Sequence, residues 1–326
     1  MMRSAIHESF GEPADVLTLA ERDKPQPAGN QIRVKMTLAP IHNHDLWTVR
    51  GNYGYKPELP AIGGSEAVGV IDAVGTEVQG LKVGQRVAIA GAHGTWAEYF
   101  VGPAKAAVPM PDELDDEIAA QLIAMPLSAL MLLEFLAVDS GQWVIQNAAN
   151  GAVGKTLAML AAARGVNVIN VVRRDDAIDE LQQLGIKHIV STANDDWQQQ
   201  VKDIMGDDPL TAAVDSVGGR ESGELLNLLG ENGTLVSFGS MTGEPMTLSS
   251  GDVIFKQAVV KGFWGSKVSQ NTSAEDKKRL IGELIQQATQ GKLQLPVEAI
   301  YDLHEAAKAA KHALQKGRQG KVLLKA

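Results

Sequence analysis

The sequence predicts an α/β protein that joins a β-rich part to a parallel sheet with helices on both faces. Residues 1–118 consist of strands and turns, with β-rich runs at 31–41, 67–75 and 83–101. From residue 119, continuous apolar strands alternate with amphipathic helices, the pattern of a parallel sheet buried on both faces. This alternation predicts a doubly wound sheet of the Rossmann type.

The alternating part begins with an apolar helical segment at 115–138, in which Pro126 marks a break or a new first turn. The strands we expect after it are 142–149, 166–173, 187–192, 211–217 and 233–239. The helices we expect between and beside them are 152–165, 175–185, 195–206 and 221–230. A mixed tail follows, with helices at 276–291 and 303–317 and a last strand at 321–326.

Composition excludes several classes of protein. The 326 residues are 44% hydrophobic, and the formal net charge of −9 argues against nonspecific nucleic-acid binding. There is no cysteine, so disulfides, Cys-ligated zinc and a thiolate nucleophile are all excluded. The start, MMRSAIHESFGEP, has no apolar core of a secretory signal, and no apolar run is long enough to span a membrane. We therefore expect a soluble cytoplasmic protein without a membrane partner.

A glycine turn, NAANGAVGK at 147–155, follows the first expected strand and opens a helix. In a dinucleotide site Gly151 lets the backbone approach a pyrophosphate, and Gly154 lets the helix pack closely on the strand. The free amides of the helix start then bind the anion. The expected phosphate contacts are Asn150, Gly151, Ala152, Val153 and Gly154. The alternative is a plain strand-to-helix turn.

Two arginines end the next strand, where a site for NAD usually carries an acidic residue. Arg173 and Arg174 stand there, about 20 residues beyond Gly151. A guanidinium suits a ribose 2′-phosphate by charge and by forked geometry, so NADPH is favoured over NADH. Two alternatives remain. The arginines could only solvate the strand end, or Asp175 and Asp176 could neutralise them or bind the ribose hydroxyl instead.

Four segments resemble the medium-chain dehydrogenase/reductase superfamily: 63–88 (GGSEAVGVIDAVGTEVQGLKVGQRVA), NAANGAVG, AAVDSVGG and GRQGKVLLK. The resemblance covers the whole chain. It implies a GroES-like catalytic domain that the Rossmann domain interrupts. The expected domains are 1–118 (GroES-like, first part), 119–260 (Rossmann, NADP-binding) and 261–326 (return to the catalytic domain).

Many members of this superfamily use a catalytic zinc, and this sequence departs from them. At the positions of their three ligands stand His42, Ser65 and a residue near Ala124, so at most one ligand survives. A catalytic zinc needs three protein ligands. His42, His44 and His93 could form another site, but histidines one residue apart on a strand would point to opposite faces. We expect no metal.

The segment RGNYGYKPELPAIGGSE at 50–66 resembles the zinc-independent branch, which contains 2-enoyl thioester reductases and quinone oxidoreductases. NVVR and FKQAVVKGFW carry the same resemblance. It implies that Tyr53 lies at the catalytic cleft, where its phenol polarises an enolate oxygen or passes on a proton. Tyr55 competes for this role, and loop packing is the alternative. His42 and Asn43 replace an Asn-Pro pair of the branch. Both are candidate substrate or nicotinamide contacts, and His42 is also a candidate proton relay. The alternative for each is a loop residue whose polar groups are satisfied within the protein.

Other residues are candidates for the nicotinamide pocket. Ser128 aligns near a hydroxyl residue that faces the nicotinamide in relatives, or it is an ordinary helix serine. Phe238 and Gly239 end a strand at the edge where such sheets bind ligands. Phe263 and Trp264 belong to a segment that adjoins the cleft in relatives, although core or subunit packing is the commoner role of such rings.

The leading hypothesis is a zinc-independent, NADPH-dependent reductase of an activated C=C bond in a 2-enoyl thioester or an enone. Quinone reduction is the enzymatic alternative. An alternative from another class is a cofactor-binding sensor or structural protein with little turnover, which would need no Tyr53. The apolar strand AVVKGFW at 258–264 follows the fifth strand of the sheet, so it should lie near the sheet edge. Such an edge favours pairing across a two-fold axis, and we expect a homodimer.

Overall fold

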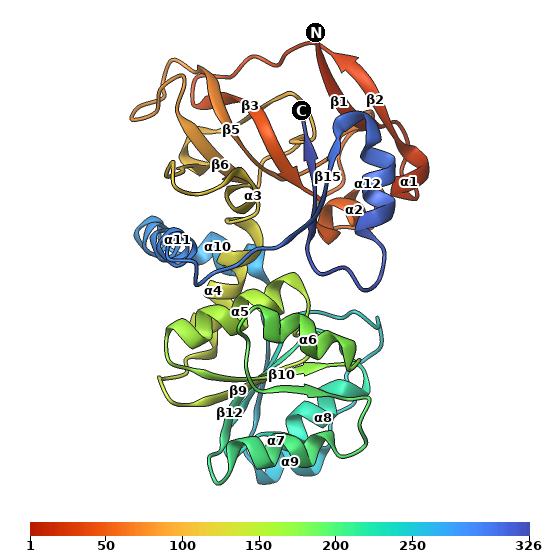
Figure 1. The fold of residues 1–326 in the computed structure, drawn as a ribbon, viewed down its shortest axis with the longest axis vertical. Coiled ribbons are helices and arrows are strands. Elements are labelled where there is room, and N and C mark those ends of the chain that lie inside the picture. Colours follow the sequence, from red (N-terminus) through yellow and green to blue (C-terminus); the bar gives the residue numbers. More distant parts are fainter. The chain divides into compact units, whose positions relative to one another are not determined.

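The computed structural model describes residues 1–326, and these divide into two compact units (Figure 1). Unit 1 comprises Met1–Ala124 and Leu295–Ala326, and unit 2 comprises Met125–Gln294. The chain therefore leaves unit 1 once and returns to it. The boundaries lie six residues later at the start of unit 2 and 34 residues later at its end than the predicted 119 and 260.

Unit 1 contains ten strands in two sheets. The smaller sheet has the order β2-β1-β4, and the larger one has the order β15-β16-β3-β5-β6-β8, with β7 paired to β3. The strands are β1 (Met2–His7), β2 (Leu17–Arg22), β3 (Gln31–Pro40), β4 (Ala61–Ile62), β5 (Glu66–Val74), β6 (Arg86–Ala90), β7 (Tyr99–Pro103), β8 (Ala107–Pro109), β15 (Val297–Asp302) and β16 (Lys321–Lys325). The helices are α1 (Pro13–Val16), α2 (Asn43–Val49), η1 (Ala104–Ala106), α3 (Asp116–Ala119), η2 (Leu303–Glu305) and α12 (Ala306–Ala313).

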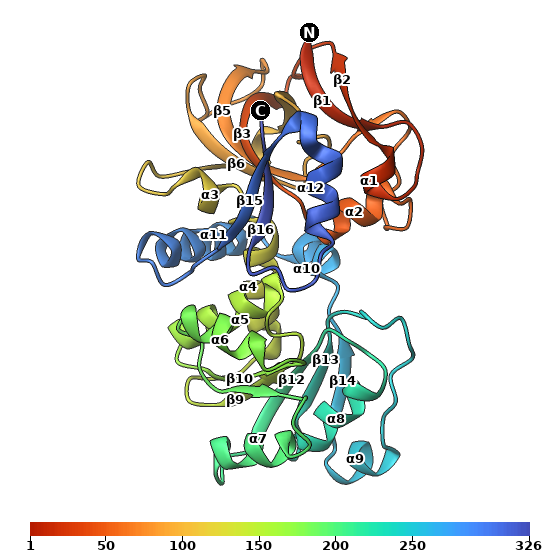
Figure 2. The ribbon, with the colours of Figure 1, turned by 45° about the vertical axis from the view of Figure 1, so that its right-hand side comes forward.

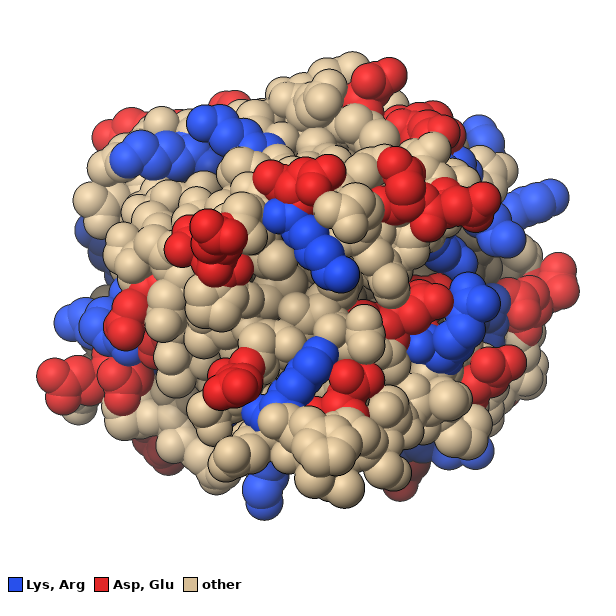
Figure 3. Space-filling view, turned by 90° about the horizontal axis from the view of Figure 1, so that it is seen from below, with Lys and Arg blue, Asp and Glu red and all other residues tan.

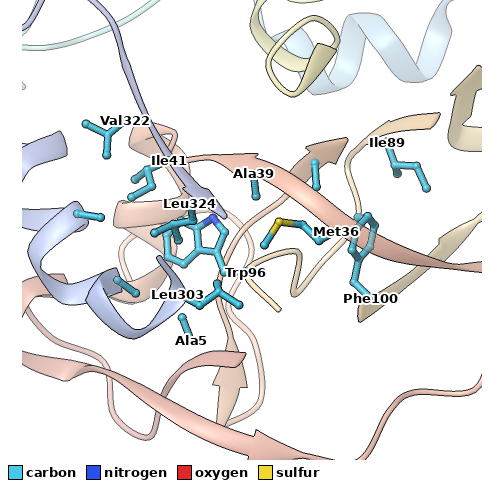
Figure 4. Close-up of a cluster of buried hydrophobic side chains, with 14 of the residues drawn as sticks. Ala5, Met36, Ala39, Ile41, Ile89, Trp96, Phe100, Leu303, Val322 and Leu324 are labelled. Atoms are coloured by element: carbon cyan, nitrogen blue, oxygen red, sulfur yellow. The ribbon is translucent and has the colours of Figure 1, made fainter. Parts of the chain in front are cut away.

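The core of unit 1 draws on both ends of the chain. Trp96 is fully buried, and its indole N–H donates to the carbonyl of Pro40 (3.2 Å). Figure 4 shows Leu303, Val322 and Leu324 from the C-terminal part in the same cluster as this ring. Burial of apolar side chains stabilises the unit, so the returning segment is an integral part of it.

One Gly-rich turn of unit 1 joins two strands that do not pair with each other. β6 and β7 lie on either side of this turn. They do not pair with each other, since β6 lies between β5 and β8 whereas β7 pairs with β3. Local β propensity locates a strand but does not choose its partner, which side-chain packing decides.

Unit 2 contains one sheet of six parallel strands in the order β11-β10-β9-β12-β13-β14. The strands are β9 (Trp143–Gln146), β10 (Asn167–Val172), β11 (Ile189–Ser191), β12 (Leu210–Asp215), β13 (Thr234–Ser237) and β14 (Val259–Gly262). Numbered along the chain, this is the order 3-2-1-4-5-6 of the Rossmann fold. The predicted doubly wound sheet is confirmed.

The helices of unit 2 cover both faces of this sheet. They are α4 (Ala124–Leu136, whose first residue belongs to unit 1), α5 (Ala152–Ala163), α6 (Asp176–Gln183), α7 (Trp197–Met205), α8 (Arg220–Leu228), α9 (Ser250–Phe255), α10 (Gly265–Asn271) and α11 (Ala274–Thr289). Figures 1 and 2 show α5 and α6 on one face, with α7, α8 and α9 on the other. Pro126 lies in the first turn of α4, as predicted, where its missing N–H costs no helical hydrogen bond.

Unit 2 extends to Gln294, beyond residue 260, because of two contacts. β14 continues the parallel sheet by pairing with β13, so residues just after 260 cannot leave the unit. Glu283 of α11 then binds Arg164, beyond the end of α5, through two hydrogen bonds of 2.9 and 2.7 Å. The return to unit 1 therefore follows α11.

Candidate functional site

The glycine turn of unit 2 has the geometry of an anion-binding helix start. Gly151 precedes the first turn of α5, and no side chain caps this end of the helix. The amides of Ala152, Val153 and Gly154 are the first three of the helix, and none of them donates a hydrogen bond within the protein. A Cβ at Gly154 would lie 2.7 Å from the carbonyl oxygen of Ala149, so only glycine permits this approach of helix to strand. Asn150, the residue before Gly151, makes no hydrogen bond within the protein.

A buried network, which the sequence did not reveal, fixes the neighbouring loop. Asn147, just after β9, donates to Asp215 at the end of β12 (2.7 Å) and accepts from the amide of Ser216 (2.7 Å). The Asp215 carboxylate also accepts from the amides of Val217 and Gly218 (2.9 and 3.0 Å). A charged acceptor with several donors holds a loop firmly. The carboxyl ends of β9 and β12 are thus tied together at the edge where ligands bind in such sheets. The available signal in the sequence was a polar residue at the carboxyl end of each of the two strands, Asn147 and Asp215.

The two arginines at the end of β10 differ in their surroundings. Arg174 pairs with Asp176 at 3.0 Å. Arg173 is exposed and makes no hydrogen bond or ion pair within the protein. Burial raises the pKa of Glu221, and the charge of Arg173 offsets part of this rise. Arg173 is therefore the guanidinium of the pair with donors available for a phosphate.

The remaining candidates of unit 2 lie at the same edge. Ser128 on α4 is half-buried beside Gly265, where an added Cβ would lie 3.2 Å from the serine hydroxyl. Gly239 passes so close to Ser216 that a Cβ would lie 2.8 Å from its carbonyl oxygen. The ring of Phe263 is buried against Phe135 and Phe238, at centroid distances of 5.3 and 5.7 Å. Its side chain therefore belongs to the core.

Trp264, the next residue, is 70% exposed. The adjacent rings of Phe263 and Trp264 thus have opposite environments. Only Trp264 presents an aromatic face to solvent, so of the two predicted aromatic contacts it alone offers a ring for stacking.

In unit 1, His42 and Glu66 form a buried pair. The two side chains are 1% and 0% exposed, and His42 Nε2 lies 2.7 Å from Glu66 Oε2. The other carboxylate oxygen accepts from the amides of Ile123 and Ala124 (2.9 and 2.8 Å). The amide of His42 donates to Asp45 (2.9 Å). This burial corrects the expectation that His42 contacts the substrate directly, because its ring has no access to a ligand.

Burial perturbs both members of the pair. It lowers the pKa of His42 well below its ordinary value. It raises the pKa of Glu66 to about 7, although hydrogen bonds from the amides of Ala124 and Ile123 favour the charged form. His42 is therefore neutral at physiological pH, and Glu66 changes its protonation near neutrality.

A stability measurement checks this assignment. A folded-state pKa raised from 4.5 to about 7 stabilises the fold at low pH, and this contribution is lost as the pH rises through 7. Relative to Glu66→Gln, which keeps the hydrogen bonds but cannot ionise, the wild type should lose about 3 kcal/mol between pH 4.5 and 7.5. Urea unfolding of both proteins at several pH values tests this. A constant difference across that range would show that Glu66 ionises normally.

The sequence-based expectation that His42 and His44 lie on a strand is wrong. They do not lie on a strand, because His42 immediately precedes α2 and His44 is its second residue. Their rings stack at a centroid distance of 4.9 Å instead of pointing to opposite faces. His44 Nε2 is hydrogen-bonded to the hydroxyl of Ser65 (2.7 Å).

The ring of Tyr53 continues this stack. It lies on His44 at a centroid distance of 5.6 Å and is 43% exposed, and its hydroxyl makes no hydrogen bond within the protein. Tyr55 stacks on His93 at 3.9 Å. Asn43 is exposed and its side chain has no hydrogen bond either. Tyr53 is therefore a phenol donor open to a ligand.

The residues at the zinc-ligand positions do not fit a zinc ion. His42 Nε2 is committed to Glu66, and the hydroxyl of Ser65 to His44. Ala124 has no ligand atom, and no group of three His, Asp or Glu side chains is arranged to bind a metal. A zinc site needs three protein ligands, and this donor set does not supply them.

Together, the parallel sheet with its glycine turn and the separate β-rich unit define a two-domain dinucleotide-dependent oxidoreductase. Residues 28–112 match the family model of the alcohol dehydrogenase GroES-like domain, and residues 152–281 match that of the zinc-binding dehydrogenases. The chain belongs to the medium-chain dehydrogenase/reductase superfamily, in its zinc-independent branch of enoyl reductases and NADPH-dependent quinone reductases. The expected family, fold class and NADPH-dependent reductase class are confirmed.

Relatives in this branch match along most of the chain. The human mitochondrial enoyl-[acyl-carrier-protein] reductase is 37% identical over 302 residues, which cover 90% of this chain and 81% of the relative. The Arabidopsis thaliana mitochondrial enzyme of the same name is 33% identical over 330 residues, 99% of this chain and 88% of the relative.

Solved structures show the same fold over the whole chain. A mycobacterial quinone oxidoreductase superposes with a TM-score of 0.90 at 25% identity, covering 100% of both chains. A quinone oxidoreductase from Pseudomonas syringae gives a TM-score of 0.87 at 26% identity, again covering 100% of both chains. A mycobacterial protein in complex with NADPH gives the same TM-score, identity and coverage.

Proposed function

We propose that this protein uses NADPH to reduce the activated C=C bond of a 2-enoyl thioester or an enone. The observation that carries the proposal is Tyr53, an exposed phenol without a hydrogen-bond partner in the protein. The relatives named enoyl-[acyl-carrier-protein] reductase support this choice of substrate. The sequence hypothesis thus remains the leading one.

The described residues of unit 2 fit NADPH. The free amides of Ala152, Val153 and Gly154 would bind the pyrophosphate, and Arg173 would bind the 2′-phosphate. The candidates for the nicotinamide end are the half-buried segment at Phe238 and Gly239, the hydroxyl of Ser128 and the ring of Trp264. The bound cofactor supplies a hydride.

Besides the hydride, the reaction needs stabilisation of negative charge and a source of a proton, and the protein must supply both. Addition of hydride to the β carbon leaves negative charge on the carbonyl oxygen, and a proton must reach the α carbon. A phenol can donate a hydrogen bond to that oxygen or pass on its proton at neutral pH. We assign this role to Tyr53. Asn43, exposed on the first residue of α2, remains a candidate substrate contact.

Quinone reduction is the second candidate function. The similar structures named quinone oxidoreductase favour it. A quinone accepts hydride more readily than an alkene, so this activity depends less on Tyr53.

A substrate panel separates these functions. NADPH oxidation would be followed with crotonyl thioester, simple enones and quinones under the same conditions. We expect turnover of the thioester or the enones. Turnover of quinones alone would overturn the enoyl proposal, and tight NADPH binding without turnover would indicate a sensor.

For the assembly we propose a homodimer formed through β14. This strand ends the sheet of unit 2, and Val259 and Val260 on it are 49% and 39% exposed. An unpaired apolar edge strand favours pairing with a second copy across a two-fold axis.

The mass in solution tests the dimer. Light scattering at micromolar concentration should give twice the chain mass of 34.7 kDa. Val259→Lys should shift the protein towards monomer, because a charge on an edge strand blocks such pairing. Leu19→Lys, at an exposed apolar residue of β2, is the matched control and should stay dimeric. A monomeric wild type would refute the proposal.

We propose no nucleic-acid or membrane partner, and a small molecule as the substrate. On the face shown in Figure 3, acidic and basic side chains are interspersed. None of the helices combines the length and the apolar character that spanning a membrane requires. We propose a cytoplasmic location, although the two relatives described above are mitochondrial enzymes. Cell fractionation would decide between the compartments.

A further inference from the structure

The loop that carries Tyr53 has few attachments to the rest of unit 1. Residues 53–60 make no hydrogen bond, either through the backbone or through side chains. Three ring contacts hold this loop: Tyr53 on His44, Tyr55 on His93, and the Lys56 ammonium 4.7 Å from the centroid of Phe10. Each such contact is weak. Because only three of them hold the loop, the loss of one should loosen it measurably.

Both histidines are anchored on the same short segment, Gly64–Ser65. The hydroxyl of Ser65 is hydrogen-bonded to His44 Nε2 (2.7 Å). The amide of Gly91 donates to the carbonyl of Ser65, and that of Gly94 to the carbonyl of Gly64 (2.9 and 3.0 Å), which fixes the turn that carries His93. Gly64 has a φ of +91°, and a Cβ there would lie 2.4 Å from the Thr95 hydroxyl oxygen, so this segment has little freedom.

His44 is held from its other side as well. The buried ring of His42 stacks on it with an interplanar angle of 17°. His42 is in turn bound to Glu66, which accepts hydrogen bonds from Ile123 and Ala124. His44 is thus held in place by Ser65 and His42, whereas Tyr53, which makes no hydrogen bond, rests on it through ring stacking alone.

We propose that His44 and His93 are positioning residues that pin the loop 53–60 by stacking on Tyr53 and Tyr55. Stacking on His44 holds the phenol of Tyr53 where it can meet the carbonyl oxygen of the substrate, and the Tyr55–His93 stack prevents the loop from lifting. The catalytic part of this inference rests on the proposed donor role of Tyr53. The pinning itself rests on the geometry alone.

Limited proteolysis tests the pinning without any activity measurement. Chymotrypsin cleaves after tyrosine, and cleavage at Tyr53 and Tyr55 in the folded protein requires the loop to lift. His44→Ala and His93→Ala should accelerate these two cuts about 2–13-fold, the range that corresponds to one aromatic pair. Cleavage after Phe255, an 83% exposed residue of unit 2, is the internal reference and should not change. Unchanged cleavage at both tyrosines would overturn the proposal.

Kinetics test whether the pinning serves Tyr53. With an enoyl or enone substrate, His44→Ala should lower kcat about 2–13-fold and leave KM nearly unchanged. His44→Phe keeps a stacking ring and should restore kcat to within twofold. His304→Ala, at an exposed histidine of η2, is the control for general destabilisation.

A double-mutant cycle completes the test. In a Tyr53→Phe background His44→Ala should cause no further loss of kcat, because the hydroxyl that His44 places is already absent. An equal loss in both backgrounds would show that His44 acts independently of Tyr53. If Tyr53→Phe alone retains activity, the donor role fails, whereas faster cleavage in His44→Ala would still establish the pinning.

Discussion

Replacing Tyr53 with phenylalanine is expected to lower kcat with enoyl or enone substrates by about 10²–10³, the effect of removing one transition-state donor. The hydroxyl is free in the protein and the ring rests on His44. The substitution therefore removes the donor and leaves the stack in place. A group that stabilises charge developing only in the transition state affects kcat more than substrate binding.

Two comparisons sharpen this prediction. Tyr55→Phe keeps the ring that stacks on His93 and should be nearly neutral. Quinones should show a smaller loss in Tyr53→Phe than alkenes do, since their reduction is intrinsically easier. If kcat stays within about threefold for every accepted alkene, the donor role is refuted. A threefold loss is less than the roughly 1.4 kcal/mol that corresponds to a factor of ten, and a transition-state donor should contribute more than that. His44 would then be the nearest candidate, as the buried His42 has no access to a ligand.

Replacing Arg173 with alanine should weaken NADPH binding about 10- to 150-fold and leave NADH binding almost unchanged. This range corresponds to about 1.5–3 kcal/mol for a charge-assisted hydrogen bond. Arg173 makes no hydrogen bond or ion pair within the protein that the phosphate would have to displace. Titration calorimetry with both cofactors measures the difference directly.

Arg174→Ala is the matched control for this experiment. Arg174 already pairs with Asp176, so its loss should affect NADPH binding less than the loss of Arg173. An equal loss of NADPH and NADH in Arg173→Ala would show that this residue does not recognise the 2′-phosphate. A larger effect at Arg174 would assign the phosphate contact to the second arginine.

Local sequence signals predicted much of unit 2. Apolar strands alternating with helices repeat along the chain, so each element is visible by itself. The glycine turn and the arginines carry their signal within one strand–helix–strand unit of about 30 residues. The place of residues after 260 was not visible in this way, because pairing of β14 with β13 keeps them in unit 2.

By itself, the sequence determined the fold class, the family and the missing zinc ligands, because each depends on residue type and on short spacing. The family resemblance added Tyr53 as the candidate donor, with Tyr55 as its competitor. Tertiary structure alone decided the surroundings of that donor. Glu66 pairs with His42 across 24 residues, and Ser65 binds His44 across 21. Contacts between such distant residues leave no periodic pattern, and burial of the pair, which shifts its pKa values, exists only once the chain has folded.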